Sequence, residues 1–156
     1  MYLAFADTPT TNTVDAYNTD IYVMHCEDDM GTNWSQALKV NDDVLANSQF
    51  FAGIAVDQTS GRVAISWYDC RNDSQNQLTQ FFAGVSGDGC TSQPRNFQLN
   101  PTASLSHQPT CSTGAADVLN YGDYTGLAFH GGYFFPTWCS FASDICGDLD
   151  TAKVRW

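Results

Sequence analysis

Basic residues are scarce in this chain of 156 residues. It has six Lys and Arg against 17 Asp and Glu, which gives a formal net charge of −11 at pH 7. The six bases are scattered along the sequence, so there is no basic patch that would favour nucleic acid or an anionic membrane surface as a partner. The acids gather in turns such as Glu27–Asp29 and Asp42–Asp43. A solvated surface is the simplest interpretation of these turns, and a structural calcium ion is the alternative.

Long apolar runs and helical periodicity are also lacking. No apolar stretch approaches the length of a membrane span, and no amphipathic helical period occurs. The N-terminal Met1–Ala6 is too short and too poor in basic residues for a signal peptide, so we expect the natural start to lie upstream in a longer parent protein. With 43% hydrophobic and 13% aromatic residues, the chain still carries enough apolar surface for one folded domain.

The six cysteines include no C-x-x-C pair, which argues against a zinc site or a redox motif. Their even number, together with few lysines, favours disulfides and a secreted or cell-surface location. Cys139 and Cys146 flank a short loop and are candidates for a disulfide, and the other pairings stay open. His25, His107 and His130 are not spaced as metal ligands, so we predict no metal and no cofactor beyond the alternative of structural calcium.

Short β-like runs separated by turn residues fill the sequence. Two of them are joined by a polar link that ends in Gly61, which is typical of a β-hairpin. The segments Pro101–Asn120 and Cys139–Asp150 are predicted to be loops. The predicted strands are Tyr2–Ala6, Asp20–His25, Ala37–Val40, Phe50–Val56, Arg62–Tyr68, Leu78–Val85, Asn96–Asn100, Tyr124–Phe129, Tyr133–Trp138 and Thr151–Trp156.

The turns and strand ends repeat along the chain. Asp29 and Asp88 lie in similar turns 59 residues apart, and Asn41 and Asn100 end the following strands at the same spacing. In addition, the segment Ser66–Asp69 is echoed before and after it, by the segments Ala4–Asp7 and Pro136–Cys139. A unit of four short strands that recurs in this way is typical of a β-propeller blade.

We therefore predict an all-β chain built of four-stranded antiparallel meanders. It forms one domain, a partial propeller of about two and a half to three blades. The predicted units are approximately 1–41, 50–100 and 121–156. An irregular β-sandwich is the alternative architecture.

Two turns carry a recognisable motif. Glu27–Trp34 resembles the Asp-box, S-x-D-x-G-x-T-W, with Asp29, Gly31 and Trp34 at the matching positions. Ser86–Thr91 is a degraded copy that keeps the Ser and the Asp, Ser86 and Asp88. Through these motifs the chain resembles sialidases and other Asp-box propellers, in which the box joins the third and fourth strands of a blade, away from the active-site face.

The resemblance implies a structural role for the five matching residues. The Asp carboxylate accepts backbone N–H groups within the turn, the Gly permits a positive φ, and the Trp packs under the hairpin. The motif therefore indicates the fold and does not assign an activity.

The resemblance raises the question of whether this chain has sialidase activity. Sialidase chemistry needs three arginines that hold a substrate carboxylate, a Tyr nucleophile activated by Glu, and an Asp acid/base. The order of segments in the family makes Arg71 a candidate carboxylate binder and Tyr124 a candidate nucleophile. The alternatives are a loop salt bridge from Arg71 to Asp69 or Asp73, and a strand-end aromatic role for Tyr124.

Several parts of the sialidase site are lacking. The Arg-Ile-Pro segment of the family is absent, and the only glutamate, Glu27, belongs to an Asp-box. We therefore expect this chain alone to be inactive as a sialidase.

Two functions remain open. One is a secreted Asp-box propeller fragment that resembles exo-sialidase-type glycoside hydrolases and carries an incomplete catalytic set. The other is a non-catalytic extracellular module with a structural role or a carbohydrate- or protein-binding role. A glycan is the expected ligand. Because blades bury their faces against neighbours, we expect the missing blades to come from the parent chain or from self-association.

Overall fold

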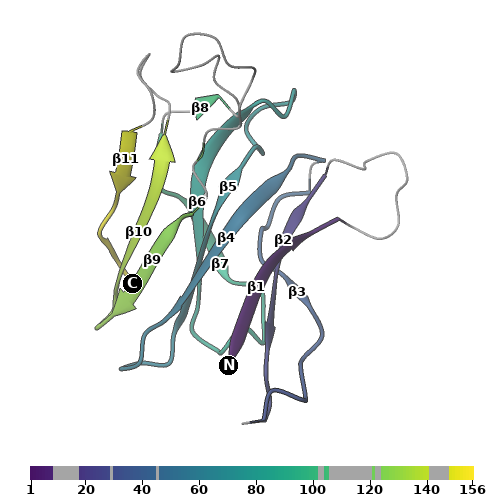
Figure 1. The fold of residues 1–156 in the computed structure, drawn as a ribbon, viewed down its shortest axis with the longest axis vertical. Helices are drawn as coiled ribbons and strands as arrows, with labels where there is room; N and C mark the ends of the chain where they lie inside the picture. Colours follow the sequence, from purple (N-terminus) through teal and green to yellow (C-terminus); the bar gives the residue numbers. More distant parts are fainter. Residues whose placement is uncertain are drawn as a thin grey trace.

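The chain folds into antiparallel β-sheets. The computed structural model describes residues 1–8, 18–28, 30–44, 46–101, 104–105, 121, 124–140 and 148–156. Within these residues there is no helix, and so none that is long and apolar enough to cross a membrane. The strands form three sheets that stand side by side, as Figure 1 shows. The prediction of an all-β chain is confirmed.

Sheets 1 and 2 hold the first eight strands. Sheet 1 consists, in this order, of β1 (Tyr2–Asp7), β2 (Asp20–His25) and β3 (Leu38–Lys39). Sheet 2 consists, in this order, of β4 (Gln49–Val56), β5 (Val63–Asp69), β6 (Leu78–Ser86) and β7 (Arg95–Gln98), and the short β8 (Ser104–Leu105) also pairs with β6. Strand β8 falls inside the predicted loop Pro101–Asn120, where the sequence shows little periodicity. Most of that segment lies outside the described residues.

Sheet 3 is centred on β10. It consists of β9 (Gly126–His130), β10 (Tyr133–Ser140), β11 (Asp148–Thr151) and β12 (Val154–Arg155). Strands β11 and β12 pair with the same edge of β10 in one unbroken register. They are therefore two halves of one strand, and the N–H of Ala152 between them donates to the carbonyl oxygen of Pro136 at 3.3 Å.

Two predicted boundaries in this region are wrong. The predicted loop Cys139–Asp150 is shorter, because β10 continues to Ser140 and its partner strand begins at Asp148. The alternation of buried and less buried residues along β10 extends to Ser140, which is itself buried. The predicted final strand, Thr151–Trp156, is correspondingly only the end of a longer strand that the structure divides into β11 and β12.

Sheet 2 lies between the other two sheets and is covered on both faces. All seven residues of β5 are buried, because successive residues of a strand point to opposite faces and each face here has a neighbouring sheet. The face toward sheet 1 packs Val63, Ile65, Trp67 and Phe82 against Ile21, Val23 and Val40. The face toward sheet 3 packs Ala64, Tyr68, Phe81, Ala83 and Val85 against Phe129, Phe134 and Trp138.

Sheets 1 and 2 repeat each other in detail. Phe5 stacks on Tyr22 with ring centroids 5.9 Å apart, and Trp67 stacks on Phe82 at 6.4 Å. The members of each stack face each other across adjacent strands, β1 and β2 in sheet 1 and β5 and β6 in sheet 2. The structure thus makes β1–β2 the counterpart of β5–β6.

The strand-end asparagines have the same role in both sheets. The side-chain oxygen of Asn41 accepts the N–H of Ile21 at 2.8 Å, and that of Asn100 accepts the N–H of Phe81 at 2.6 Å. Each asparagine therefore ties the end of an outer strand to its neighbour.

Candidate functional site

The candidate residue Arg71 lies in a buried polar cluster between sheets 1 and 2, which we call the polar corner. The cluster forms where the end of β5 meets the residues that follow β3. Gln49 enters it because β4 pairs Gln49 with Asp69. The polar corner consists of Asp20, Lys39, Asn41, Asp42, Asp43, Gln49, Asp69 and Arg71.

Asp69 is the fixed centre of the polar corner. It is buried, and its carboxylate accepts hydrogen bonds from the indole N–H of Trp67 at 2.7 Å and from the backbone N–H of Arg71 at 2.8 Å. The side chain of Arg71 reaches the same carboxylate through Nε at 2.9 Å and through a terminal nitrogen at 2.7 Å. Paired charge-assisted bonds of this kind hold a guanidinium in one orientation.

The guanidinium of Arg71 contacts three carboxylates and one aromatic ring. Its terminal nitrogens also lie 2.5 Å from Asp42 and 3.8 Å from Asp43, and its guanidinium lies 4.3 Å from the ring centroid of Phe82. The side chain is only 14% exposed. Burial alone would lower the pKa of Arg71, but the bonds to Asp69 and Asp42 and the charge of Asp43 raise it above its ordinary value. Arg71 therefore stays charged and joins sheet 2 to the end of sheet 1.

Asn41 organises the other half of the polar corner. Its amide group is buried and donates toward Asp20 at 2.7 Å, Asp43 at 2.6 Å and Gln49 at 2.8 Å. Lys39 pairs with Asp20 at 2.7 Å. Four carboxylates thus face two basic groups, and the amides of Asn41 and Gln49 supply the remaining donors. In the part of the chain that the structure describes, no three or more His, Cys, Asp or Glu side chains are arranged so that they could hold a metal ion.

The second candidate, Tyr124, has different surroundings. It precedes β9 and is 88% exposed. The neighbouring Thr125 hydroxyl donates to the carbonyl oxygen of Phe51 at 3.5 Å, which places this segment beside β4. Glu27 lies after β2 and accepts a bond from Asn33 at 3.0 Å. The described residues of this chain thus give Tyr124 no buried environment and no hydrogen bond to a carboxylate.

Two buried tyrosines, Tyr68 and Tyr121, have raised pKa values. The hydroxyl of Tyr68 donates to the carbonyl oxygen of Cys139 and accepts the N–H of the same residue, both at 2.9 Å. The hydroxyl of Tyr121 lies 2.5 Å from that of Thr79. Burial raises the pKa of both Tyr68 and Tyr121. Both phenols are therefore protonated at neutral pH, and their hydroxyls form hydrogen bonds within the core.

The two turns that resemble the Asp-box are held by hydrogen bonds to their acidic and serine side chains. In the second turn the hydroxyls of Ser92 and Ser86 donate to Asp88 at 2.5 and 2.7 Å and lower its pKa. In the first turn Gly31 has a φ of +74°, and the indole N–H of Trp34 donates to its carbonyl oxygen at 3.0 Å. Asp29 lies outside the described residues.

Sequence reasoning missed Asp28, whose carboxylate accepts several hydrogen bonds within the first turn. Its carboxylate accepts the hydroxyl of Thr32 at 2.6 Å, and also backbone N–H groups of Thr32 at 3.1 Å and of Met30 at 3.0 Å. These bonds lower the pKa of Asp28. At a spacing of 60 residues Asp28 aligns with Asp88 and Thr32 with Ser92, one residue away from the predicted pairing of Asp29 with Asp88. This alignment would have found Asp28.

Asp57 was also missed, and it joins sheets 2 and 3. It is buried in the turn after β4, where the hydroxyls of Thr59 and Ser60 donate to it at 2.7 and 2.8 Å. It also accepts the N–H groups of Gly131 at 3.1 Å and Gly132 at 2.9 Å, in the turn between β9 and β10. Burial would raise the pKa of Asp57, but these hydrogen bonds lower it. The local signal was an Asp followed by Thr and Ser, which is typical of an Asx-turn.

The cysteines of the described part are free thiols. Cys26, Cys70, Cys90 and Cys139 form no disulfide with one another. Cys70 is buried, and burial raises the pKa of its thiol to about 12, which disfavours the thiolate that reacts. The candidate partner of Cys139, Cys146, lies outside the described residues.

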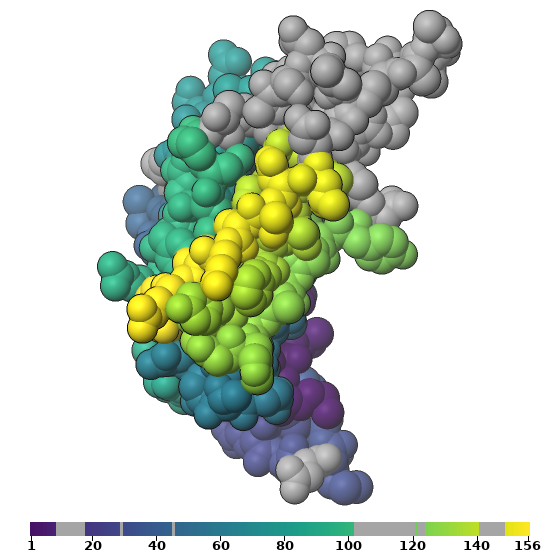
Figure 2. All heavy atoms as spheres, turned by 90° about the vertical axis from the view of Figure 1, so that its left-hand side faces the viewer, coloured from purple at the N-terminus to yellow at the C-terminus, as the bar shows by residue number. Residues whose placement is uncertain are grey.

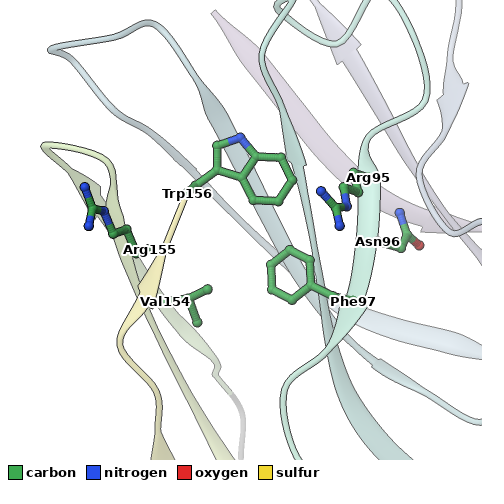
Figure 3. A pocket seen from close by; sticks show the side chains of 6 residues that line it. All are labelled: Arg95, Asn96, Phe97, Val154, Arg155 and Trp156. Carbon is green, nitrogen blue, oxygen red and sulfur yellow. The ribbon is translucent and has the colours of Figure 1, made fainter.

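A groove separates the outer strands of sheets 2 and 3 (Figure 3). Its volume is about 470 Å³, which lies within the range of small-ligand sites. Phe97 stacks on Trp156 with ring centroids 5.9 Å apart, and the guanidinium of Arg95 lies 5.6 Å from the same indole ring. Arg155 also lines the groove, but Figure 3 shows its guanidinium directed away from the indole.

Comparison of the chain with protein-family models, with curated proteins and with solved structures gave no match.

Proposed function

We propose that this chain forms three neighbouring blades of a secreted Asp-box β-propeller and serves as the scaffold of an extracellular carbohydrate- or protein-binding module. The parent protein is of the exo-sialidase type, and this part of it does not hydrolyse glycosides by itself. Two features support the propeller: the matching turns at Asp28 and Asp88, and the position of β4, which lies against β1 of sheet 1 and β9 of sheet 3.

The occupied guanidinium of Arg71 is the observation that carries the scaffold role. A substrate carboxylate would have to displace Asp69, Asp42 or Asp43, of which Asp69 and Asp43 are almost fully buried. An unpaired buried carboxylate is costly, so the exchange is unfavourable. Arg71 is better suited to hold two blades together than to bind a ligand.

The groove beside Trp156 supports the binding role. The half-buried rings of Phe97 and Trp156 and the exposed Arg95 offer apolar edges and a cation to a ligand in this groove. The groove lies between two sheets, where ligand sites in proteins commonly form.

A hydrolysis assay tests the proposal. We expect neither the 156-residue protein nor its Tyr124→Phe variant to release fluorophore from a fluorogenic sialoside above the rate without protein, because Tyr124 lacks the activating environment of a nucleophile. Circular dichroism of both proteins confirms equal folding. Hydrolysis by the wild-type protein that is lost in a folded Tyr124→Phe variant would overturn the non-catalytic assignment.

A further inference from the structure

The two contacts between sheets use the same pair of faces. We call the face of a sheet that looks toward the preceding sheet its N-side face, and the opposite one its C-side face. In sheet 2 the N-side face contains Ile65, Trp67 and Phe82 and packs on the C-side face of sheet 1. The C-side face of sheet 2, with Tyr68 and Phe81, packs on the N-side face of sheet 3. An N-side face therefore meets a C-side face at both contacts.

One face of each kind is left open at the ends of the row of sheets. Along a strand alternate residues share a face, so the N-side face of sheet 1 carries Leu3, Phe5, Tyr22 and Met24. The C-side face of sheet 3 carries Tyr133, Phe135, Leu149, Lys153 and Arg155. Figure 2 is turned toward sheet 3, whose lime and yellow residues lie uncovered by sheets 1 and 2.

Both open faces expose large apolar side chains. Leu3 is 48% exposed, Phe135 41% and Leu149 76%. Large apolar side chains exposed on a sheet face favour an interaction site there.

The open face of sheet 1 has the residue types of a face that is buried elsewhere in the molecule. Phe5 and Tyr22 are paired across β1 and β2 as Trp67 and Phe82 are paired across β5 and β6. Leu3, two residues before Phe5, corresponds in the same way to Ile65, two residues before Trp67. The open N-side face of sheet 1 is therefore suited to pack on a C-side face. The C-side face of sheet 3 is such a face, and it is also open.

The charges near the two open faces are complementary. The ammonium of Lys153 lies 4.4 Å from the ring centroid of Tyr133, and Tyr133 pairs with Arg155 across the strands. Neither base forms an ion pair with another described residue. At the end of sheet 1 the turn after β2 carries Glu27 and Asp28.

The contact between sheets 1 and 2 shows where this acidic turn would lie. Tyr2 of β1 approaches the second box turn, where its hydroxyl would be 3.2 Å from a Cβ placed on Gly89. Burial and then the nearby Cys90 and Asp88 raise the pKa of Tyr2. If sheet 3 met a sheet 1 in the same way, its basic open face would approach the turn that contains Glu27 and Asp28.

We propose that a second copy of this chain packs the N-side face of its sheet 1 on the C-side face of sheet 3, head to tail. The contact buries Phe5 and Tyr22 of one copy against Tyr133 and Phe135 of the other, with Arg155 near Glu27. This contact rests on the internal repetition of the sheets and not on the proposed sialidase resemblance. Such a contact is heterologous, and two copies close into a ring of six sheets if each step rotates equally. Closure of the ring depends on the proposed propeller fold, whereas the contact itself does not.

Light scattering during size-exclusion chromatography tests the proposal on the 156-residue protein. We expect association at high micromolar concentration, to twice the monomer mass where the ring closes and to larger assemblies where it stays open, and dissociation on dilution. A monomer mass at every concentration would overturn the proposal, and would leave further sheets of a longer chain as the occupant of both faces.

A mixing experiment tests the head-to-tail arrangement. Phe5→Asp damages only the N-side face of sheet 1, and Phe135→Asp only the C-side face of sheet 3. Each variant alone should be monomeric, and an equimolar mixture should form a heterodimer through the two intact faces. A Phe135→Asp variant that still dimerises alone would instead show a symmetric contact between two copies of sheet 1 and would overturn the proposal.

A charge exchange tests the register of the contact. Arg155→Glu and Glu27→Arg should each weaken the dimer, and the double variant should restore it to within about threefold, since the pair is partly screened by solvent. Circular dichroism establishes that each variant is folded. Failure of the double variant to recover would overturn the proposed register of Arg155 and Glu27.

Discussion

A single guanidinium, that of Arg71, connects residues that are far apart in the sequence. Asp42 and Asp43 follow β3, and Asp69 ends β5, so these carboxylates approach one another only because sheets 1 and 2 pack together. Like charges at this spacing repel, and Arg71 offsets the repulsion at one point. Its position over the ring of Phe82 adds a cation–π contact that a smaller base would not reproduce.

Replacement of Arg71 tests this account. We expect Arg71→Met to lower the free energy of unfolding by about 3–5 kcal/mol, because the buried Asp69 is left without its charged partner. Urea denaturation followed by tryptophan fluorescence measures the change. The matched control is Arg95→Met, which removes an exposed arginine from a cation–π contact and should cost no more than about 1 kcal/mol. Equal costs for the two variants would contradict the role of Arg71.

At the scale of strands, the two asparagines Asn41 and Asn100 secure the ends of outer strands. Each accepts an N–H group of a neighbouring strand that would otherwise lack a partner at the sheet end. Asn41 has the additional task of donating to acids of the polar corner. One residue thus completes a sheet and also links that sheet to the next.

Substitutions of Asn41 separate these two tasks. Asn41→Ala should lower the free energy of unfolding by about 3 kcal/mol, because it leaves a buried N–H and several acceptors without a partner. Asn41→Asp keeps the acceptor for Ile21 but places a carboxylate among Asp20 and Asp43, so we expect a loss at least as large at pH 7. Urea denaturation measures both, and a near-neutral Asn41→Asp would show that the donated bonds contribute little.

The strands could be predicted from the sequence because their signals are local. A short apolar run, Ile21–Met24, between polar residues predicts the strand Asp20–His25 with the bounds that the structure has. The matching segments Ala4–Asp7 and Ser66–Asp69 occupy equivalent strands. In the third unit Trp138 faces sheet 2 as Trp67 faces sheet 1, so the echo at Pro136–Cys139 is shifted by one residue. A shift of one residue reverses the face of every side chain, which a short motif does not reveal.

The polar corner and the joint at Asp57 could not be predicted in the same way. The sequence placed Asp69 and Asp73 beside Arg71, and the structure selects Asp69 together with Asp42 and Asp43 from another sheet. Asp73 instead accepts N–H groups of its own turn, including that of Gln77 at 2.7 Å. Contacts of this kind depend on how sheets pack, and no local pattern encodes the packing.

For the molecule as a whole, acid resistance depends on carboxylates that are hydrogen-bonded only in the folded state. The pKa values of Asp57, Asp28 and Asp88 are lowered on folding. The unfolded chain therefore takes up protons first as the pH falls. The stability that these groups contribute is present above an unfolded pKa of about 4 and is lost as the pH falls toward their folded pKa values.

Asp57, which joins sheets 2 and 3, allows the dependence of stability on pH to be measured. Asp57→Asn should lower the free energy of unfolding at pH 7, and its difference from the wild-type protein should shrink as the pH falls below about 4. Urea denaturation at a series of pH values measures the difference. The exposed Asp7 lies outside the joint, so Asp7→Asn is the control and should follow the wild-type curve. A difference for Asp57→Asn that stays constant down to strongly acidic pH would contradict the role of its charge.

The repeated pairing of an N-side face with a C-side face has a consequence for how such a chain can change in length. Every sheet offers its neighbours the same two kinds of surface, so a gene segment that encodes one sheet of about 60 residues could be duplicated or deleted without creating a new kind of contact. The polar corner and the Asp57 joint, by contrast, each belong to one contact. They are the places where an inserted or removed unit would have to be matched to its neighbours, and so they fix the order of the sheets in this chain.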